Sequence, residues 1–138
     1  LPNPLIPLKK FAYAAAQLAD YKKLNENSAT AKRIINSCIK FPEITGGSKS
    51  INSILTKLSN GKAFFKNGAE GVFVAIIPTL KSALAVKIID GARRAAEVAI
   101  AGLLSELKII NNEKINKIKK TLIKNSANKI IGSMQWIC

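Results

Sequence analysis

Lys66 is the side chain with the clearest potential for chemistry in this sequence of 138 residues. It ends a predicted strand and is followed by Asn67-Gly68-Ala69-Glu70-Gly71. Glycine lets the backbone approach a ligand closely, and polar side chains gathered at a turn can orient that ligand. Partial burial at such a corner would lower the pKa of a lysine, so Lys66 could act as a base or as a positive charge toward a serine or a substrate. The alternative is an ordinary strand lysine, one among 19.

Glu70 is the carboxylate of this corner and lies between the small residues Ala69 and Gly71. Its functional interpretation is a charge-assisted hydrogen bond to a ligand ammonium group or to a neighbouring side chain. Its structural interpretation is a turn carboxylate that pairs with one of the many lysines. The sequence favours the structural interpretation.

A second polar cluster, Asp90-Gly91-Ala92-Arg93-Arg94, opens an alanine-rich segment. Asp90 is well placed to accept hydrogen bonds from the free backbone N–H groups at the start of a helix. Either arginine could pair with Glu70 or Asp90 and brace the corner described above. The sequence leaves open which arginine faces inward.

Other catalytic constellations find little support. The chain has no histidine, which removes histidine-based triads and histidine-containing metal sites. Ser-x-x-Lys spacings arise by chance in a lysine-rich chain, and none here is followed by an apolar helix at the head of a cleft. These spacings are Ser37/Lys40, Ser59/Lys62, Ser105/Lys108 and Ser126/Lys129.

A net charge of +14 directs attention to nucleic acids and anionic membranes. The lysines, however, are not interleaved with aromatic residues that could stack on bases, and an AT-rich genome also produces a chain rich in Lys, Ile and Asn. No apolar run reaches the ~20 residues that span a bilayer, and the longest candidate, 72–77, stops at Pro78. We therefore expect neither a nucleic-acid partner nor a membrane partner.

The length and the cysteines indicate the class of protein. A chain of 138 residues with a hydrophobic fraction of 48% suits one domain with a real core. Cys38 and Cys138 are far apart and lack neighbouring ligands, so we interpret them as a buried free thiol and a chain-end thiol. Free thiols indicate a reducing, cytoplasmic setting.

Hydrophobic periodicity and turn signals predict an α+β fold, an antiparallel sheet with flanking helices. Strands over 62–65, 71–77 and 82–89 should form a meander with a helix packed on one face, and a last strand is expected over 130–136. Chain breakers predict a loop over 42–49. The predicted helices cover residues 8–24, 29–40, 50–58, 91–108 and 113–125.

One long motif is similar to a known family. It runs through Lys66-Asn67-Gly68-Ala69-Glu70-Gly71-Val72-Phe73 and an apolar hairpin to Lys87-Ile88-Ile89-Asp90-Gly91-Ala92-Arg93-Arg94-Ala95-Ala96-Glu97. Here the chain resembles the bacterial L-asparaginase II family, which has a serine-β-lactamase-like fold and is unrelated to the threonine-dependent asparaginases. Three other stretches agree, and the likeness extends to about Asn111: Pro4-Leu5-Ile6-Pro7-Leu8, Phe41-Pro42-Glu43 before Gly46-Gly47, and Asn60-Gly61-Lys62.

The resemblance implies a fold and a set of site residues. The chain would be the C-terminal part of a serine-β-lactamase or penicillin-binding-like fold, in which a strand carrying Lys-Thr-Gly lines the site. Lys66 would be the catalytic lysine, acting with serine–lysine pairs in the hydrolysis of L-asparagine to L-aspartate and ammonia. Asn52, Gly68, Ala69 and Glu70 would bind the substrate at the adjoining wall.

The resemblance also implies that something is missing. The family's nucleophilic Ser-x-x-Lys and its zinc ligands would precede Leu1, so we expect residues 1–138 to be a single domain or a domain fragment without a cofactor of its own. Alone it would be inactive, because nothing attacks the amide carbon. Its partners would be L-asparagine and either the missing N-terminal half or a homodimer partner, which would cover apolar sheet surface.

Two alternatives stay open. One is a degenerate basic module that kept the fold, lost catalysis and binds nucleic acid or an anionic membrane. The other is a β-lactamase-like enzyme that acts on a different amide, such as glutamine or a peptide.

Overall fold

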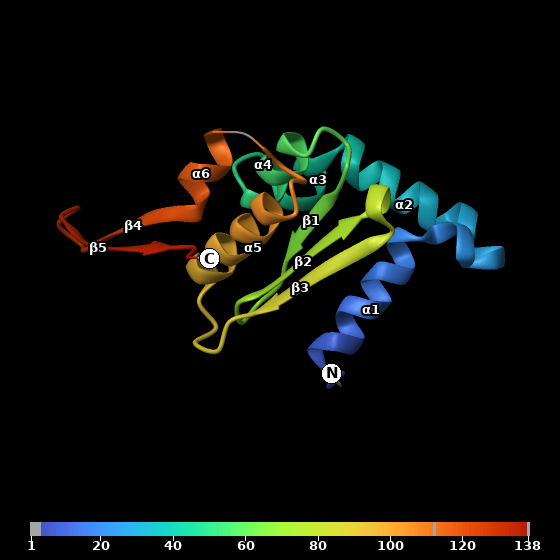
Figure 1. Cartoon of the computed structure of the whole chain (residues 1–138), viewed down its shortest axis with the longest axis horizontal. Coiled ribbons are helices and arrows are strands. Elements are labelled where there is room, and N and C mark those ends of the chain that lie inside the picture. Colours follow the sequence, from blue (N-terminus) through green and yellow to red (C-terminus); the bar gives the residue numbers. More distant parts are fainter. Residues whose placement is uncertain (1–3, 112, 138) are drawn as a thin grey trace.

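A meander of three antiparallel strands forms the centre of the molecule in a computed structural model that describes residues 4–111 and 113–137 (Figure 1). The strands are β1 (Phe64–Asn67), β2 (Val72–Ile77) and β3 (Ser82–Lys87). Their order is β1-β2-β3, and the register places Phe65 opposite Ala75 and Val72 opposite Lys87. The predicted meander is confirmed, with each outer strand shifted or shortened by about two residues.

Helices cover both faces of this sheet, which confirms the predicted α+β fold of an antiparallel sheet with flanking helices. Side chains alternate between the two faces of a strand, so Phe65 and Phe73 point to one side and Phe64 and Val74 to the other. The first side packs against α4 (Ile51–Leu58), α5 (Arg93–Glu106) and α6 (Glu113–Lys119). The second side packs against α1 (Leu8–Ala19) and α2 (Ser28–Lys40).

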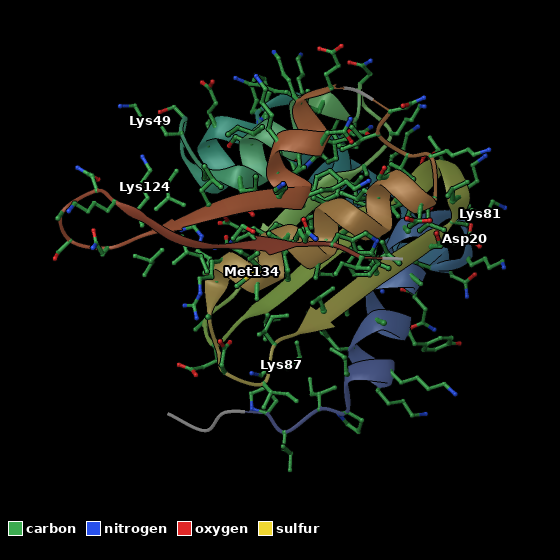
Figure 2. All side chains as sticks on the ribbon, turned by 60° about the vertical axis from the view of Figure 1, so that its left-hand side comes forward. Asp20, Lys49, Lys81, Lys87, Lys124 and Met134 are labelled. Carbon is green, nitrogen blue, oxygen red and sulfur yellow. The ribbon has the colours of Figure 1, made fainter. Side chains whose placement is uncertain are left out.

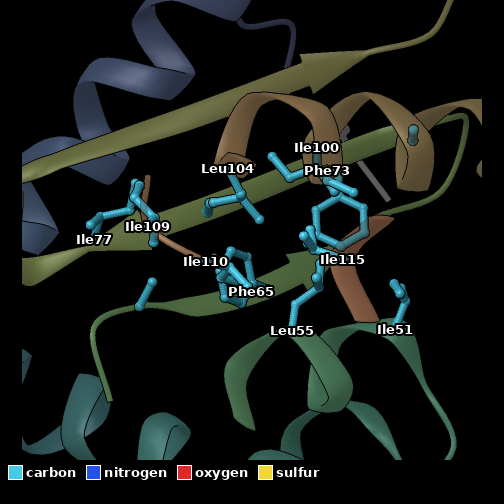
Figure 3. Close-up of a cluster of buried hydrophobic side chains, with 14 residues drawn as sticks. Ile51, Leu55, Phe65, Phe73, Ile77, Ile100, Leu104, Ile109, Ile110 and Ile115 are labelled. Carbon is cyan, nitrogen blue, oxygen red and sulfur yellow. The ribbon is translucent and has the colours of Figure 1, made fainter. Parts of the chain in front are cut away.

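The larger hydrophobic core lies between the sheet and α5 (Figure 3). Burial of these large apolar groups is the main force that holds α4, α5 and α6 against the sheet. The residues of this core that are labelled in Figure 3 come from both strands and helices and are Ile51, Leu55, Phe65, Phe73, Ile77, Ile100, Leu104, Ile109, Ile110 and Ile115.

Several boundaries differ from those predicted. α1 ends at Ala19 and is followed by the short turns η1 (Tyr21–Lys23) and η2 (Asn25–Asn27). The predicted loop over 42–49 begins with a short helix, α3 (Pro42–Gly46), because proline is favourable at the first helical position and Gly47, with φ +89°, ends the turn. A further turn, η3 (Pro78–Leu80), connects β2 to β3.

The predicted helix over 113–125 is wrong in its second half. α6 ends at Lys119, and the chain continues directly into β4 (Lys120–Lys124), which pairs with β5 (Ile130–Gln135). Ile115 and Ile118 fix α6 to the core. Beyond them Thr121-Leu122-Ile123 contains two β-branched residues that suit a strand, and the facing strand supplies the hydrogen bonds. The resulting hairpin projects from the body of the molecule (Figure 1).

Candidate functional site

Lys66 lies on the outer strand β1, next to its end. Its side chain is exposed, so the partial burial expected from the sequence is not found. Lys66 Nζ donates a hydrogen bond to the Asn67 carbonyl oxygen at 3.0 Å. Within residues 4–111 and 113–137 this carbonyl is its polar partner, and no serine hydroxyl contacts the amine. The structure therefore places an exposed cation at the end of the strand, and no serine among the described residues hydrogen-bonds to it and could make it a general base.

Asn52 on α4 hydrogen-bonds to the outer edge of β1, at the residue that follows Lys66. Its side chain is 3% exposed, and its Oδ1 accepts a hydrogen bond from the Asn67 backbone nitrogen at 3.0 Å. Its Nδ2 also donates to the Asn67 side-chain oxygen. The first bond satisfies an edge N–H that β2 does not reach, which is the usual weak point of an outer strand. The structure thus brings Asn52 and Lys66 to the same residue, Asn67.

Asn67 is the residue of this group that the sequence analysis did not single out. It is half-buried, and it receives bonds at its backbone nitrogen, its backbone oxygen and its side chain. The sequence carried no clear signal for it, because Asn52 falls beside the helical stripe of Ile51, Ile54, Leu55 and Leu58 and its burial follows from tertiary packing. The partner of Asn52 was not readable from spacing.

The start of α4 is fixed by two serines. Ser50 caps the helix by accepting from the Ser53 backbone nitrogen. The buried Ser53 hydroxyl lies 2.8 Å from the Pro42 carbonyl oxygen and 2.7 Å from that of Gly47, so its one proton is shared between them. Both hydroxyls therefore hold the α3–α4 connection in place. Neither contacts the Lys66 amine.

The turn between β1 and β2 carries the remaining predicted site residues. Gly68, Ala69 and Glu70 are exposed, and the Gly68 nitrogen donates to the Val72 oxygen at 2.8 Å. Glu70 adopts φ +55°, and its carboxylate lies over Gly91 in the turn between β3 and α5. These three residues are thus accessible to a ligand, and Glu70 joins two turns that are far apart in the sequence.

Arg93 and Arg94 form ion pairs with residues of α5 or of the turn just before it. Arg94 pairs with Asp90 at 3.3 Å and Arg93 pairs with Glu97 at 2.6 Å, and neither pairs with Glu70. Asp90 accepts a hydrogen bond from the Ala92 nitrogen at 2.8 Å, so it satisfies a backbone donor just ahead of α5 while Ala92 takes the capping position. This cluster therefore organises the start of α5 and does not brace Lys66.

An apolar hollow of about 410 Å³ lies at the same end of the sheet. Val72 and Lys87, which are opposite each other in the register, form its floor, and the segment 4–8 together with Phe11 forms its wall. Alternation along the strands puts Lys66 and Val72 on the same face. Lys87 Nζ donates to the Ile88 oxygen at 2.7 Å. Lys66 is not among the residues that line this hollow.

A polar hollow of about 220 Å³ lies between α1 and η3, at the opposite end of the sheet. Asp20 Oδ2 is 2.9 Å from Lys23 Nζ, and Asp20 Oδ1 is 3.7 Å from Lys81 Nζ. Figure 2 shows Asp20 and Lys81 side by side. The hydrogen bond from Lys23 lowers the pKa of Asp20 despite the burial that opposes it, with a further contribution from Lys81. The same bond raises the pKa of Lys23. We interpret the ion pairs of Asp20 with Lys23 and Lys81 as a structural link between the end of α1 and the β2–β3 turn.

The described residues hold no cluster of acidic and cysteine side chains that could bind a metal ion. Among the described positions no three side chains of the types cysteine, aspartate and glutamate come together, and Cys38 is a free, half-buried thiol. Cys138 lies outside the described residues. The zinc implied by the resemblance is expected on ligands that precede Leu1, so no residue described here is proposed as its ligand and no chemical step is assigned to it.

Comparison with known proteins gives a clear family relationship. The sequence model described as L-asparaginase II matches residues 1–136. No curated protein matches the chain significantly.

Among the described residues, no helix is both long enough and apolar enough to cross a membrane.

Proposed function

Because the chain belongs to the L-asparaginase II family, we propose that it forms one wall of an amidohydrolase site that converts L-asparagine to L-aspartate and ammonia. The observation that carries this proposal is the family match over residues 1–136, which includes the whole of the β1–β2 corner. The family supports an asparaginase-type function and L-asparagine as the substrate. The assignment of individual residues rests on the geometry of the corner.

In this proposal Lys66 supplies the positive charge of the site. Its amine lies at the exposed end of β1, where its hydrogen-bond partner among the described residues is the Asn67 oxygen, so it can turn toward a bound molecule. A lysine is a flexible point charge that suits the α-carboxylate of an amino acid, or a serine brought beside it. Asn52 contributes indirectly, by holding Asn67 in place, because both polar atoms of its carboxamide are hydrogen-bonded to Asn67.

Gly68, Ala69 and Glu70 form the rest of the proposed wall. The two small residues let a substrate reach the backbone, and all three are exposed. Glu70 lies beside Gly91 and is not paired with Arg93 or Arg94, so its carboxylate is available to bind the α-ammonium group of asparagine. A cation and an anion at one turn match the two charged groups of a free amino acid.

We propose further that this chain does not turn over substrate alone. Hydrolysis by covalent catalysis needs a hydroxyl within reach of its base, and the hydrogen bonds of Lys66 within the described residues include none. The nucleophile would come from an N-terminal half of the serine-β-lactamase-like type or from the partner in a homodimer. A cytoplasmic setting is part of the same proposal and is supported by the free thiol of Cys38.

The test is an assay of ammonia release from L-asparagine, with L-glutamine and D-asparagine as comparison substrates. The purified chain is assayed alone and after mixing with the separately produced N-terminal half of a complete family member. We expect no turnover by the chain alone and measurable, L-asparagine-selective turnover by the mixture. Robust turnover by the chain alone would overturn the incomplete-site argument, and selectivity for glutamine would change the substrate.

A lysine variant tests the role of the corner within the same assay. Lys66→Met should reduce the turnover of the mixture by on the order of a hundredfold or more, as expected for loss of a general base or of a charge at the reacting group. Lys124→Met, at an exposed lysine of the hairpin, is the matched control and should leave turnover unchanged. Equal activity of the two variants would remove Lys66 from the catalytic machinery.

A further inference from the structure

The β4–β5 hairpin is a projecting arm that touches the body of the molecule mainly at its base (Figure 1). At the base, the Trp136 nitrogen donates to the Lys119 oxygen at 2.9 Å, and Lys119 Nζ donates to the Ser105 hydroxyl at 3.2 Å. The Trp136 ring lies directly against Gly102 of α5. These contacts fix the direction of the arm. Figure 2 shows Lys124 far out along it and Met134 nearer the body.

The tip of the arm is ordered by its own hydrogen bonds. Asn125 Oδ1 accepts from the backbone nitrogens of Ala127 and Lys129, each at 3.0 Å. The Asn125 nitrogen also donates to the Lys129 oxygen at 3.0 Å. A surface that is already ordered loses less conformational entropy when it binds a partner. The arm is therefore built as a preformed contact surface.

One face of the arm alternates cationic and apolar residues. Lys120 and Leu122 point to the same side because side chains alternate along a strand. The register shifts between Ile123 and Lys124, and beyond this irregularity Lys124 is paired with Ile130 across the hairpin. Leu122 is 50% exposed and Ile130 61% exposed. On the opposite face Ile123 and Met134 are half-buried. The outward face thus presents large apolar groups to solvent between lysines.

The charge of this segment has one sign. Lys117, Lys120, Lys124 and Lys129 are all exposed, and within the described residues none of the four takes part in an ion pair. In the sequence no acidic residue follows Glu113. Unpaired like charges on a protruding surface favour an anionic partner and disfavour a second copy of the same arm.

The apolar residues decide which anionic partner fits. Lysines alone can neutralise a nucleic-acid backbone, but the outward face has none of the aromatic residues that stack on bases and none of the arginines that contact phosphates and bases through two hydrogen bonds. Exposed leucine and isoleucine gain nothing from a phosphate backbone. A bilayer with anionic headgroups satisfies both features, because lysines lie at the headgroups while the apolar side chains enter the interface.

We propose that the β4–β5 hairpin attaches this chain to the surface of an anionic phospholipid bilayer. Lys120, Lys124 and Lys129 contact the headgroups, and Leu122 and Ile130 enter the interfacial layer. The attachment is peripheral, and it departs from the sequence-based expectation of no membrane partner. It is independent of the amidohydrolase proposal, because none of these residues belongs to the β1–β2 corner.

The test is sedimentation of the full chain with vesicles of phosphatidylcholine, with and without phosphatidylserine. Binding should require phosphatidylserine and weaken as salt is added. Neutralising all three headgroup lysines should weaken partitioning by on the order of a hundredfold, since each lysine near such a surface contributes about fivefold. The control removes three exposed lysines of α1 and α2 and should change partitioning far less. The test set is Lys120→Gln, Lys124→Gln and Lys129→Gln, and the control set is Lys9→Gln, Lys10→Gln and Lys32→Gln.

A second variant separates a bilayer from a soluble polyanion. Leu122→Ser combined with Ile130→Ser keeps every charge and should still weaken vesicle binding at least tenfold, without changing retention on duplex DNA. Equal loss in the test and control lysine sets would mean that only net charge matters and would overturn the proposal. Binding to DNA that depends on the arm, without binding to vesicles, would replace the bilayer by nucleic acid.

Discussion

Asn52 of α4 and Asn67 at the end of β1 are joined twice, through the Asn67 backbone nitrogen and through their two side chains. This pair closes an edge of the sheet that β2 cannot reach. It also fixes the carbonyl oxygen to which Lys66 donates its hydrogen bond. A buried helix residue thereby determines the position of the exposed strand end that we propose as the site wall.

Replacing Asn52 with alanine should destabilise the protein by about 1–3 kcal/mol, because it leaves the edge N–H and the carboxamide of Asn67 without partners in a part-buried place. Urea unfolding followed by circular dichroism measures this loss. Asn36→Ala, at an exposed position of α2, is the matched control and should stay within about 0.5 kcal/mol of the parent. Equal effects of the two substitutions would show that the pair contributes nothing to stability.

Gly71→Ala should be strongly unfavourable, whereas Gly68→Ala should be tolerated. Gly71 has φ +67°, and a Cβ there would lie 2.9 Å from Ile88 Cβ and 3.1 Å from the Gly91 carbonyl carbon. We expect a loss of about 1–3 kcal/mol in unfolding free energy for this variant. At Gly68 the nearest atom to an added Cβ, Val72 Cβ, is at an ordinary 3.4 Å. Similar midpoints of urea unfolding for the two variants would contradict the close packing of the two turns.

Gly102→Ala should displace the indole of Trp136. An added Cβ would lie 2.1 Å from Trp136 Cδ2, so the ring must move and the base of the hairpin with it. We expect a changed tryptophan emission spectrum and a destabilisation of about 1–3 kcal/mol. Gly132→Ala is the control, because a Cβ there meets nothing within 4 Å. Since Trp136 is the single tryptophan of the chain, an unchanged emission spectrum in Gly102→Ala would exclude this contact.

The pH dependence of stability should reveal Asp20. Its pKa in the folded protein lies below the ordinary value of 3.8 because of the hydrogen bond from Lys23, so its contribution is present above that value and is lost as the pH falls. The raised pKa of Lys23 means that its contribution is present below 10.5 and is lost only as the pH rises beyond it.

Asp20→Asn should therefore be less stable than the parent at neutral pH, and the difference should shrink as the pH falls below about 4. Urea midpoints measured across this range give the comparison. Asn36→Ala, at an exposed position without an ionisable side chain, is the control and should parallel the parent across this range. A difference between Asp20→Asn and the parent that stays constant on acidification would argue against a titrating ion pair.

The sequence by itself determined the local elements and the family. Alternating apolar residues and turn signals located the three strands of the meander, because turn chemistry and strand periodicity are properties of neighbouring residues. The long motif from Lys66 to Glu97 indicated the L-asparaginase II family, which the match over 1–136 supports.

Only the tertiary structure decided which surfaces these elements share. Whether helices cover one or both faces of the sheet, whether Lys66 is buried, and which residue satisfies Asn52 all depend on contacts between distant segments. The change from helix to strand after Lys119 also depends on contacts between distant segments. Its residues carry an ambiguous apolar pattern, and the packing of Ile115 and the pairing with β5 outweigh the small local preference for a helix.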